Sequence, residues 1–140
     1  AAEPTVETDS PAFCIVDAGH GLGHAAGALA MGMAIDKAKV MGVGLGLTKR
    51  SNHYGAAGVY ATMASDQGLI GMSMTGTSQR SIVPTFAREP RYSTNPIACA
   101  VPAGDRPAFV LDMATSTVAV GKLDIYRRLG KQLPTGWALT

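Results

Sequence analysis

Residues 17–42 read DAGHGLGHAAGALAMGMAIDKAKVMG, and this stretch decides the fold of the chain. Its alanines recur every fourth residue, at Ala26, Ala30, Ala34 and Ala38. Such spacing places a ridge of methyl groups along one face of a helix. Gly42 stands where a left-handed C-terminal cap belongs. The stretch therefore predicts a helix over residues 23–41, with a face that another backbone can approach closely.

The segments on either side of this helix predict strands and further helices. Apolar runs bounded by glycine, proline and polar turns indicate five strands: Ala12–Asp17, Val43–Thr48, Leu69–Thr75, Ile97–Val101 and Ala108–Asp112. Two more helices are expected, over Ala56–Asp66 and Val118–Leu129. Residues 1–10 are expected to be extended, and residues 76–95 to form a long loop with one strand at SIVPTF (81–86). The fold class is therefore α/β, with an α+β-like mixed sheet.

The composition indicates one domain with a sizeable core, because 46% of the 140 residues are hydrophobic and only 16% are charged. Aromatic residues contribute only 6%, so the core must be built from Ala, Val, Leu, Ile and Met. Twelve basic residues against ten acidic ones give a net charge of +2, which excludes nucleic acid as the default partner. No apolar run approaches the roughly 18 residues of a membrane span, so no membrane partner is expected.

Two cysteines, Cys14 and Cys99, lie in the apolar runs AFCIVDA and NPIACAV. Thiols in such runs point to core packing in a reducing compartment, and we expect the protein to be cytoplasmic. A single disulfide between them is the alternative. The polar start of the chain, AAEPTVETDS, does not resemble a signal peptide.

The glycine-rich turn before the first helix has two interpretations. Gly21–Ala26 (GLGHAA) fits G-x-G-x-x-A, a form of the Rossmann fingerprint that places a pyrophosphate on a helix N-terminus. That fingerprint also needs an acidic residue at the end of the second strand to hold a ribose. The chain offers Lys49 and Arg50 there, which would suit a 2′-phosphate instead. The alternative is a turn whose glycines serve only tight packing.

Three histidines are candidates for chemistry. His20 and His24 are spaced like a metal pair, but no third ligand accompanies them, so we predict no metal site. His53, in KRSNHYGAAG (49–58), lies between a strand and a helix, where α/β proteins bind ligands. A histidine there can donate or accept a proton near neutral pH. The alternative is a loop histidine that only caps the turn, with Ser51 or Asn52 as the N-cap of the helix.

Five segments, taken in order, resemble the malate/L-lactate dehydrogenase type 2 family: VDAGHGLGHAAGALAM (16–31), SNHYGAAGVYATMA (51–64), GLIGMSMT (68–75), REPRYSTNPIACAVPAG (88–104) and FVLDMATS (109–116). That family includes ureidoglycolate, sulfolactate, malate and lactate dehydrogenases, diketogulonate reductase and piperideine-2-carboxylate reductase. The resemblance runs from about Ala12 to the end of the chain. It implies that residues 1–140 are the central, cofactor-binding portion of a longer oxidoreductase.

The resemblance also implies a cofactor and its contacts. It implies NAD or NADP, held by a dinucleotide-binding domain that is not a Rossmann fold, so the glycine turn would be structural. The implied cofactor contacts lie in three segments: Asp112, Met113, Ala114, Thr115 and Ser116; Thr94 and Asn95 with Pro96; and Thr77. His53 matches the histidine assigned as acid/base in some members. The proton donor of other members is a histidine that has no counterpart in this sequence.

The expected function is hydride transfer between a nicotinamide cofactor and a small 2-hydroxy or 2-oxo acid. The cation that would bind the substrate carboxylate is not identified, although Arg50, Arg80 and Arg88 are candidates in loops. The low charge and frequent Val, Met and Leu predict a homodimer or larger assembly. Two alternatives remain: a non-catalytic domain on the same scaffold that binds a nucleotide or a partner, and a Rossmann dehydrogenase that uses Gly21–Ala26.

Overall fold

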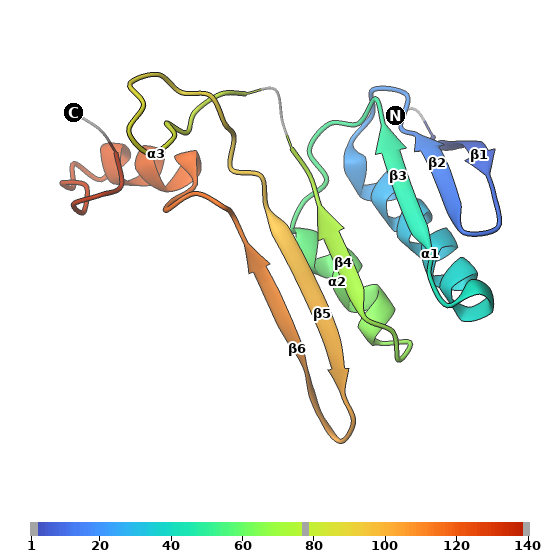
Figure 1. Cartoon of the computed structure of the whole chain (residues 1–140). Coiled ribbons are helices and arrows are strands. Elements are labelled where there is room, and N and C mark those ends of the chain that lie inside the picture. Colours follow the sequence, from blue (N-terminus) through green and yellow to red (C-terminus); the bar gives the residue numbers. More distant parts are fainter. Residues whose placement is uncertain (1–2, 77–78, 139–140) are drawn as a thin grey trace. The chain divides into compact units, whose positions relative to one another are not determined.

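The computed structural model describes residues 3–76 and 79–138, and it confirms the mixed α/β class (Figure 1). Along the chain the elements are β1 (Thr5–Asp9), β2 (Phe13–Asp17), α1 (Gly23–Met41), β3 (Leu45–Lys49), α2 (Ala57–Ser65), β4 (Gly71–Met74), β5 (Ile97–Ala103), β6 (Arg106–Met113) and α3 (Val120–Arg128). None of the helices among these residues is long and apolar enough to cross a bilayer.

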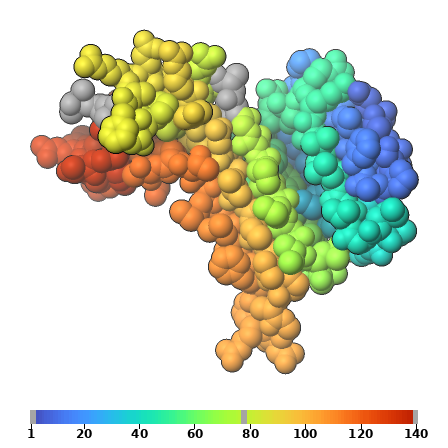
Figure 2. Space-filling view, viewed as in Figure 1, coloured from blue at the N-terminus to red at the C-terminus, as the bar shows by residue number. Residues whose placement is uncertain are grey.

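The strands form two sheets of three. In the first sheet β2 is central, antiparallel to β1 and parallel to β3, so the sheet is mixed as expected. In the second sheet the order is β4-β5-β6, and β5 and β6 are joined by a tight turn at Gly104 and Asp105. Figure 2 shows the tip of this hairpin, in orange, standing out into solvent.

Helix α1 packs on the first sheet through backbone contact rather than through large side chains. The alanine ridge is buried at Ala26, Ala30 and Ala34. A Cβ on Gly46 of β3 would lie 2.4 Å from the Ala30 carbonyl oxygen, so only glycine allows the strand this close. Gly42 caps the helix with φ 81°. The predicted helix, its cap and the close approach of another backbone are all confirmed.

The second sheet meets helix α2 in the same way. Ala57 and Ala61 of α2 form a buried cluster with Ala98 and Ala100 of β5. A Cβ on Gly71 of β4 would lie 2.2 Å from the Ala61 carbonyl oxygen. Alanine and glycine therefore make the closest contacts in both helix–sheet layers, and the buried core also contains Val16 and Ile35, as the composition suggested.

The large apolar side chains lie mostly on the other face of each sheet. The parallel register places Phe13 beside Leu45 and Ile15 beside Leu47, on the face opposite the buried Cys14. Leu45 is 53% exposed and Leu47 46% exposed. On the second sheet Met72 and Met74 are also exposed, on the face that alternates with the buried Gly71.

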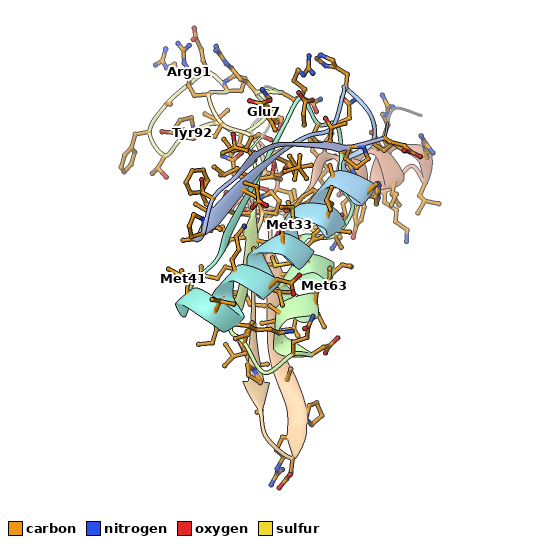
Figure 3. All side chains as sticks on the ribbon, turned by 90° about the vertical axis from the view of Figure 1, so that its right-hand side faces the viewer. Glu7, Met33, Met41, Met63, Arg91 and Tyr92 are labelled. Atoms are coloured by element: carbon orange, nitrogen blue, oxygen red, sulfur yellow. The ribbon has the colours of Figure 1, made fainter. Side chains whose placement is uncertain are left out.

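The methionines of helix α1 also differ in how deeply they are buried (Figure 3). Met33 of α1 packs against the buried cluster of β2 and α1, whereas Met41, at the end of the same helix, is 53% exposed.

Both cysteines are free thiols, and Cys14 is completely buried, so the disulfide alternative is wrong. Burial raises the pKa of the Cys14 thiol.

One sequence-based expectation is wrong, and another gains detail. Residues 81–86 form no strand, and their only ladder contact is an isolated bridge between Ile82 and Tyr92. The N-terminal segment, expected only to be extended, contains β1, which pairs with β2 through a register shift between Val6 and Thr8. Its sequence, TVETD, is mostly polar because β1 is an edge strand with one neighbour.

The chain divides into two compact units. One consists of Ala1–Ser73 with Ala98–Leu111, and the other of Met74–Ile97 with Asp112–Thr140. The chain crosses between the units three times, within strands β4, β5 and β6. No linker marks the boundary, so no feature of the sequence indicates a division.

Candidate functional site

A cavity of about 510 Å³, wide open to solvent, lies within the second unit, between the end of β4 and the turn that leads into β5. Its walls carry both apolar and polar groups: Met74, Thr75, Gly76, Asn95, Pro96, Ile97 and Thr115. The volume is in the range of small-molecule sites, and such sites combine apolar walls with a few oriented polar atoms. Three of the predicted cofactor contacts, Asn95, Pro96 and Thr115, therefore line one space, although Asn95 and Thr115 are 20 residues apart in sequence.

Thr115 joins the two segments that form this cavity. Its backbone N–H donates to the Thr94 carbonyl at 2.8 Å, and its hydroxyl donates to the same oxygen at 3.0 Å. Across the cavity the Thr75 N–H donates to the Pro96 carbonyl at 3.4 Å. Asn95 has φ 37°, a left-handed conformation that asparagine tolerates better than most residues. The turn at 94–96 is therefore held from both sides.

The other predicted cofactor contacts flank the cavity rather than line it. Asp112 and Met113 end strand β6, and both are exposed. Ala114 is half-buried, and the Ser116 hydroxyl donates to the Val118 carbonyl at 3.1 Å. Thr77 lies outside the described residues. The structure thus brings together part of the predicted set around one space.

His53 lies in the first unit, on an exposed loop before α2. The helix starts at Ala57, later than the sequence suggested, and neither Ser51 nor Asn52 is its N-cap, which is Ala56. Nδ1 of His53 accepts a hydrogen bond from the Gly55 N–H at 3.1 Å. Since Nδ1 is the acceptor, the neutral ring carries its proton on Nε2, which is the nitrogen left to meet a substrate.

The glycine turn is closed by the loop of His53. The Gly23 N–H, which a pyrophosphate would need, donates to the His53 carbonyl at 3.0 Å. A Cβ on Gly23 would lie 2.6 Å from the Asn52 carbonyl oxygen and from Ser51 Oγ. The chain itself occupies the position next to Gly23, so the packing interpretation of this turn holds and the Rossmann one does not.

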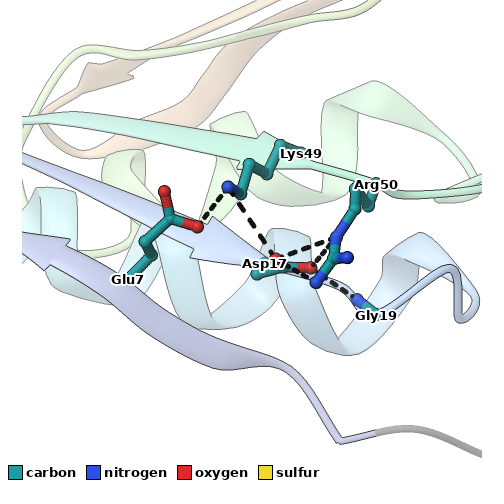
Figure 4. A network of polar contacts seen from close by, with 5 residues as sticks. All are labelled: Glu7, Asp17, Gly19, Lys49 and Arg50. Atoms are coloured by element: carbon teal, nitrogen blue, oxygen red, sulfur yellow. Dashed lines mark hydrogen bonds and ion pairs between the residues drawn. The ribbon is translucent and has the colours of Figure 1, made fainter.

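The basic side chains near this turn form ion pairs with acidic side chains of the same chain (Figure 4). Arg50 donates from Nε and Nη2 to both carboxylate oxygens of Asp17, with distances of 2.6–3.0 Å, and Lys49 pairs with Glu7. The Arg50 side chain and the Gly19 N–H lower the pKa of Asp17 to about 2. Arg50 is therefore held in a structural pair, whereas Arg80 and Arg88 lie exposed in the 76–95 loop.

His20 and His24 do not form part of a metal centre in the described part of the chain, where no group of three His, Cys, Asp or Glu side chains could hold an ion. His20 instead adopts a left-handed φ of 61° in the turn, and Nε2 of His24 lies against Gly55. Sequence reasoning missed one feature near His53: Tyr54 and Tyr60 stack with ring centroids 4.9 Å apart, and the Tyr60 hydroxyl donates to the Tyr54 carbonyl.

Comparison with known proteins gives the family. The family model described as Malate/L-lactate dehydrogenase matches residues 1–140. The malate dehydrogenase of Pyrococcus horikoshii is 49% identical over 131 residues, which are 94% of this chain and 36% of that protein. The Delta(1)-pyrroline-2-carboxylate/Delta(1)-piperideine-2-carboxylate reductase of Pseudomonas aeruginosa is 34% identical over 138 residues, 99% of this chain and 41% of that protein.

A solved structure agrees with these relatives. The crystal structure of malate dehydrogenase from Entamoeba histolytica superposes with a TM-score of 0.90 at 35% identity, covering 97% of this chain and 37% of that one. The chain therefore spans between about a third and two fifths of the length of these proteins. Its whole length matches the family, and the chain belongs to the malate/L-lactate dehydrogenase family.

Proposed function

We propose that this chain is the cofactor-binding portion of an oxidoreductase that transfers a hydride between NAD or NADP and a small 2-hydroxy or 2-oxo acid. The observation that carries the proposal is the cavity between Asn95 and Thr115, formed by the segments that match the family. The relatives named above are a malate dehydrogenase and a reductase of cyclic imine carboxylates, so both act on small carboxylic acids.

The residues of the cavity fit one part of a dinucleotide. Met74, Pro96 and Ile97 supply flat apolar walls for a heterocyclic ring, while Asn95 and Thr115 supply polar side chains for an amide or a ribose. Asp112 and Met113 at the end of β6, and Ala114 and Ser116 directly after it, belong to the same proposed contact set, as does Thr77. When bound, the cofactor would supply or accept the hydride.

His53 is the proposed acid/base group. As an imidazolium, the ring would donate its Nε2 proton to the oxygen of a 2-oxo acid as that oxygen becomes a hydroxyl, and the neutral ring that remains keeps its proton on Nδ1. This step requires the Gly55 N–H to release Nδ1. In the oxidative direction this neutral ring, with its proton on Nδ1, accepts the hydroxyl proton of the 2-hydroxy acid at Nε2. The exposure of the loop leaves the ring open to substrate.

Replacing His53 tests this assignment. In the full-length enzyme His53→Ala should lower kcat by roughly 10²–10⁴ while dinucleotide affinity stays nearly intact, because only the proton transfer is removed. His53→Asn keeps size and polarity and should lose almost as much, because asparagine cannot transfer a proton. The readout is loss of reduced nicotinamide absorbance with a panel of small 2-oxo acids. Full turnover in both variants with weakened dinucleotide binding would make His53 a positioning residue.

The same proposal covers assembly and location. Exposed Leu45, Leu47, Met72 and Met74 support a homodimer or larger assembly, which sedimentation at micromolar concentration would reveal and a monodisperse monomer would contradict. Two free thiols support a reducing compartment such as the cytoplasm. The rival function, a non-catalytic binding domain, predicts dinucleotide binding without turnover in the same assay.

A further inference from the structure

The loop that carries His53 is held to the glycine turn by a ladder of backbone hydrogen bonds. The His20 N–H donates to the Arg50 carbonyl at 2.7 Å, and the Asn52 N–H donates to the Gly21 carbonyl at 3.0 Å. The third bond is that from Gly23 to His53 described above. Donors alternate between the two segments, as they do between paired strands, so the glycine turn fixes the path of this loop.

Asn52 adds a side-chain bond to this ladder. Its Nδ2 donates to the His20 carbonyl at 2.6 Å. The residue directly before His53 is thus tied to the turn twice, once through its backbone and once through its amide. The neighbouring Ser51 makes no such link, because its hydroxyl donates locally to the Asn52 carbonyl at 2.9 Å.

The imidazole is fixed on the other side by Gly55. Its N–H donates to Nδ1 of His53, and its φ of 84° is one that glycine adopts without strain. A Cβ at this position would also lie 2.9 Å from Nε2 of His24. The backbone of His53 is therefore set by Asn52 and the glycine turn, while its ring is set by Gly55.

We propose that Asn52 is a positioning residue that holds His53 in the orientation needed for proton transfer. This inference rests on the proposed function, because it assumes that His53 is the acid/base group. Removing the amide leaves the Asn52 backbone bond in place but frees the loop from the His20 carbonyl. A small displacement of the His53 ring from the reacting oxygen should lower the catalytic rate and leave the affinity for the cofactor unchanged.

The test uses Asn52→Ala and Asn52→Asp in the full-length protein. Asn52→Asp keeps the size of the side chain but places a carboxylate against the His20 carbonyl. Both should lower kcat by roughly 10- to 100-fold, with dinucleotide affinity unchanged. The matched control is Gln67→Ala, which removes another exposed amide side chain that bonds across elements, to Lys39, in the same unit. It should lower the melting temperature as much as Asn52→Ala does and leave kcat unchanged.

A second readout does not depend on turnover. The ¹⁵N shifts of the His53 ring should show a fixed tautomer, with the proton on Nε2, in the wild-type protein and in Gln67→Ala, and an average of both tautomers in Asn52→Ala. Unchanged ring shifts, or an unchanged kcat in an active enzyme, would overturn the role of Asn52. If the ring shifts change as expected but the wild-type protein reduces no 2-oxo acid, the positioning of His53 stands and the proposed function fails.

Discussion

Two turns of this molecule can be compared directly: the glycine turn at 18–23 and the plain turn at 94–96. The first carries the pattern of a nucleotide site, yet the backbone of the His53 loop fills the space beside Gly23. The second has no recognised pattern, yet a cavity of about 510 Å³ lies against it. Glycine in a turn indicates that something comes close, and here the close neighbour is the chain itself.

The largest expected difference between the two turns is in the free energy of unfolding when a methyl group is added to each. Gly23→Ala should destabilise the fold by about 1–3 kcal/mol, because the new Cβ meets three atoms at 2.6 Å. Gly76→Ala, beside the cavity, should cost much less, since its nearest neighbour is Asn95 Oδ1 at 3.5 Å. Urea unfolding of the two variants measures the difference.

The control for this pair is Gly32→Ala, which lies in the same helix as Gly23 with nothing within 4 Å. It should stabilise the protein by up to about 1 kcal/mol through helix propensity alone. Equal unfolding free energies for Gly23→Ala and Gly32→Ala would show that the turn is not closed in solution.

A smaller effect is expected at the turn of residues 94–96, beside the cavity. Thr115→Val keeps the backbone bond to the Thr94 carbonyl but removes the hydroxyl bond at 3.0 Å. The same hydroxyl is a proposed contact of the dinucleotide, and losing that contact, about 1 kcal/mol, should raise the dissociation constant for the dinucleotide roughly fivefold. Titration of the cofactor fluorescence measures it. The control is Thr117→Val, which changes an exposed threonine nearby in the sequence. An equal change of the dissociation constant in both variants would show that the cavity is not part of the dinucleotide site.

The smallest effect, a change in the free energy of unfolding, should appear only at acidic pH. Since the pKa of Asp17 falls from 3.8 to about 2 on folding, its ion pair with Arg50 contributes its full stability above pH 3.8. That contribution should disappear as the pH falls from 3.8 through 2. The difference in unfolding free energy between the wild-type protein and Asp17→Asn should shrink over this window, while Asp105→Asn serves as the reference. A constant difference would mean that the pair does not form.

The sequence predicted α1 to the residue, because the alanine ridge and Gly42 are both local signals. It also predicted that the turns holding Asn95 and Thr115 belong together, but only through the family resemblance. It could not place large residues such as Leu45 and Met72 outside the helix–sheet layers, because a strand pattern does not say which face meets a helix. Nor could it find the hydrogen bond from the Asn52 amide to the His20 carbonyl, because the two residues are 32 positions apart.

The alanine–glycine contact between α1 and β3 restricts how this protein can evolve. At Ala30, Ala34, Gly44 and Gly46 the two backbones touch, so any larger side chain forces the layers apart. No compensating change in a neighbouring side chain can restore the distance, because the neighbour is a carbonyl group. Random substitution should therefore be rejected at these four positions and accepted at Leu45 and Leu47 on the same strand, wherever the replacement is apolar. One strand would then record two rates of change, alternating residue by residue.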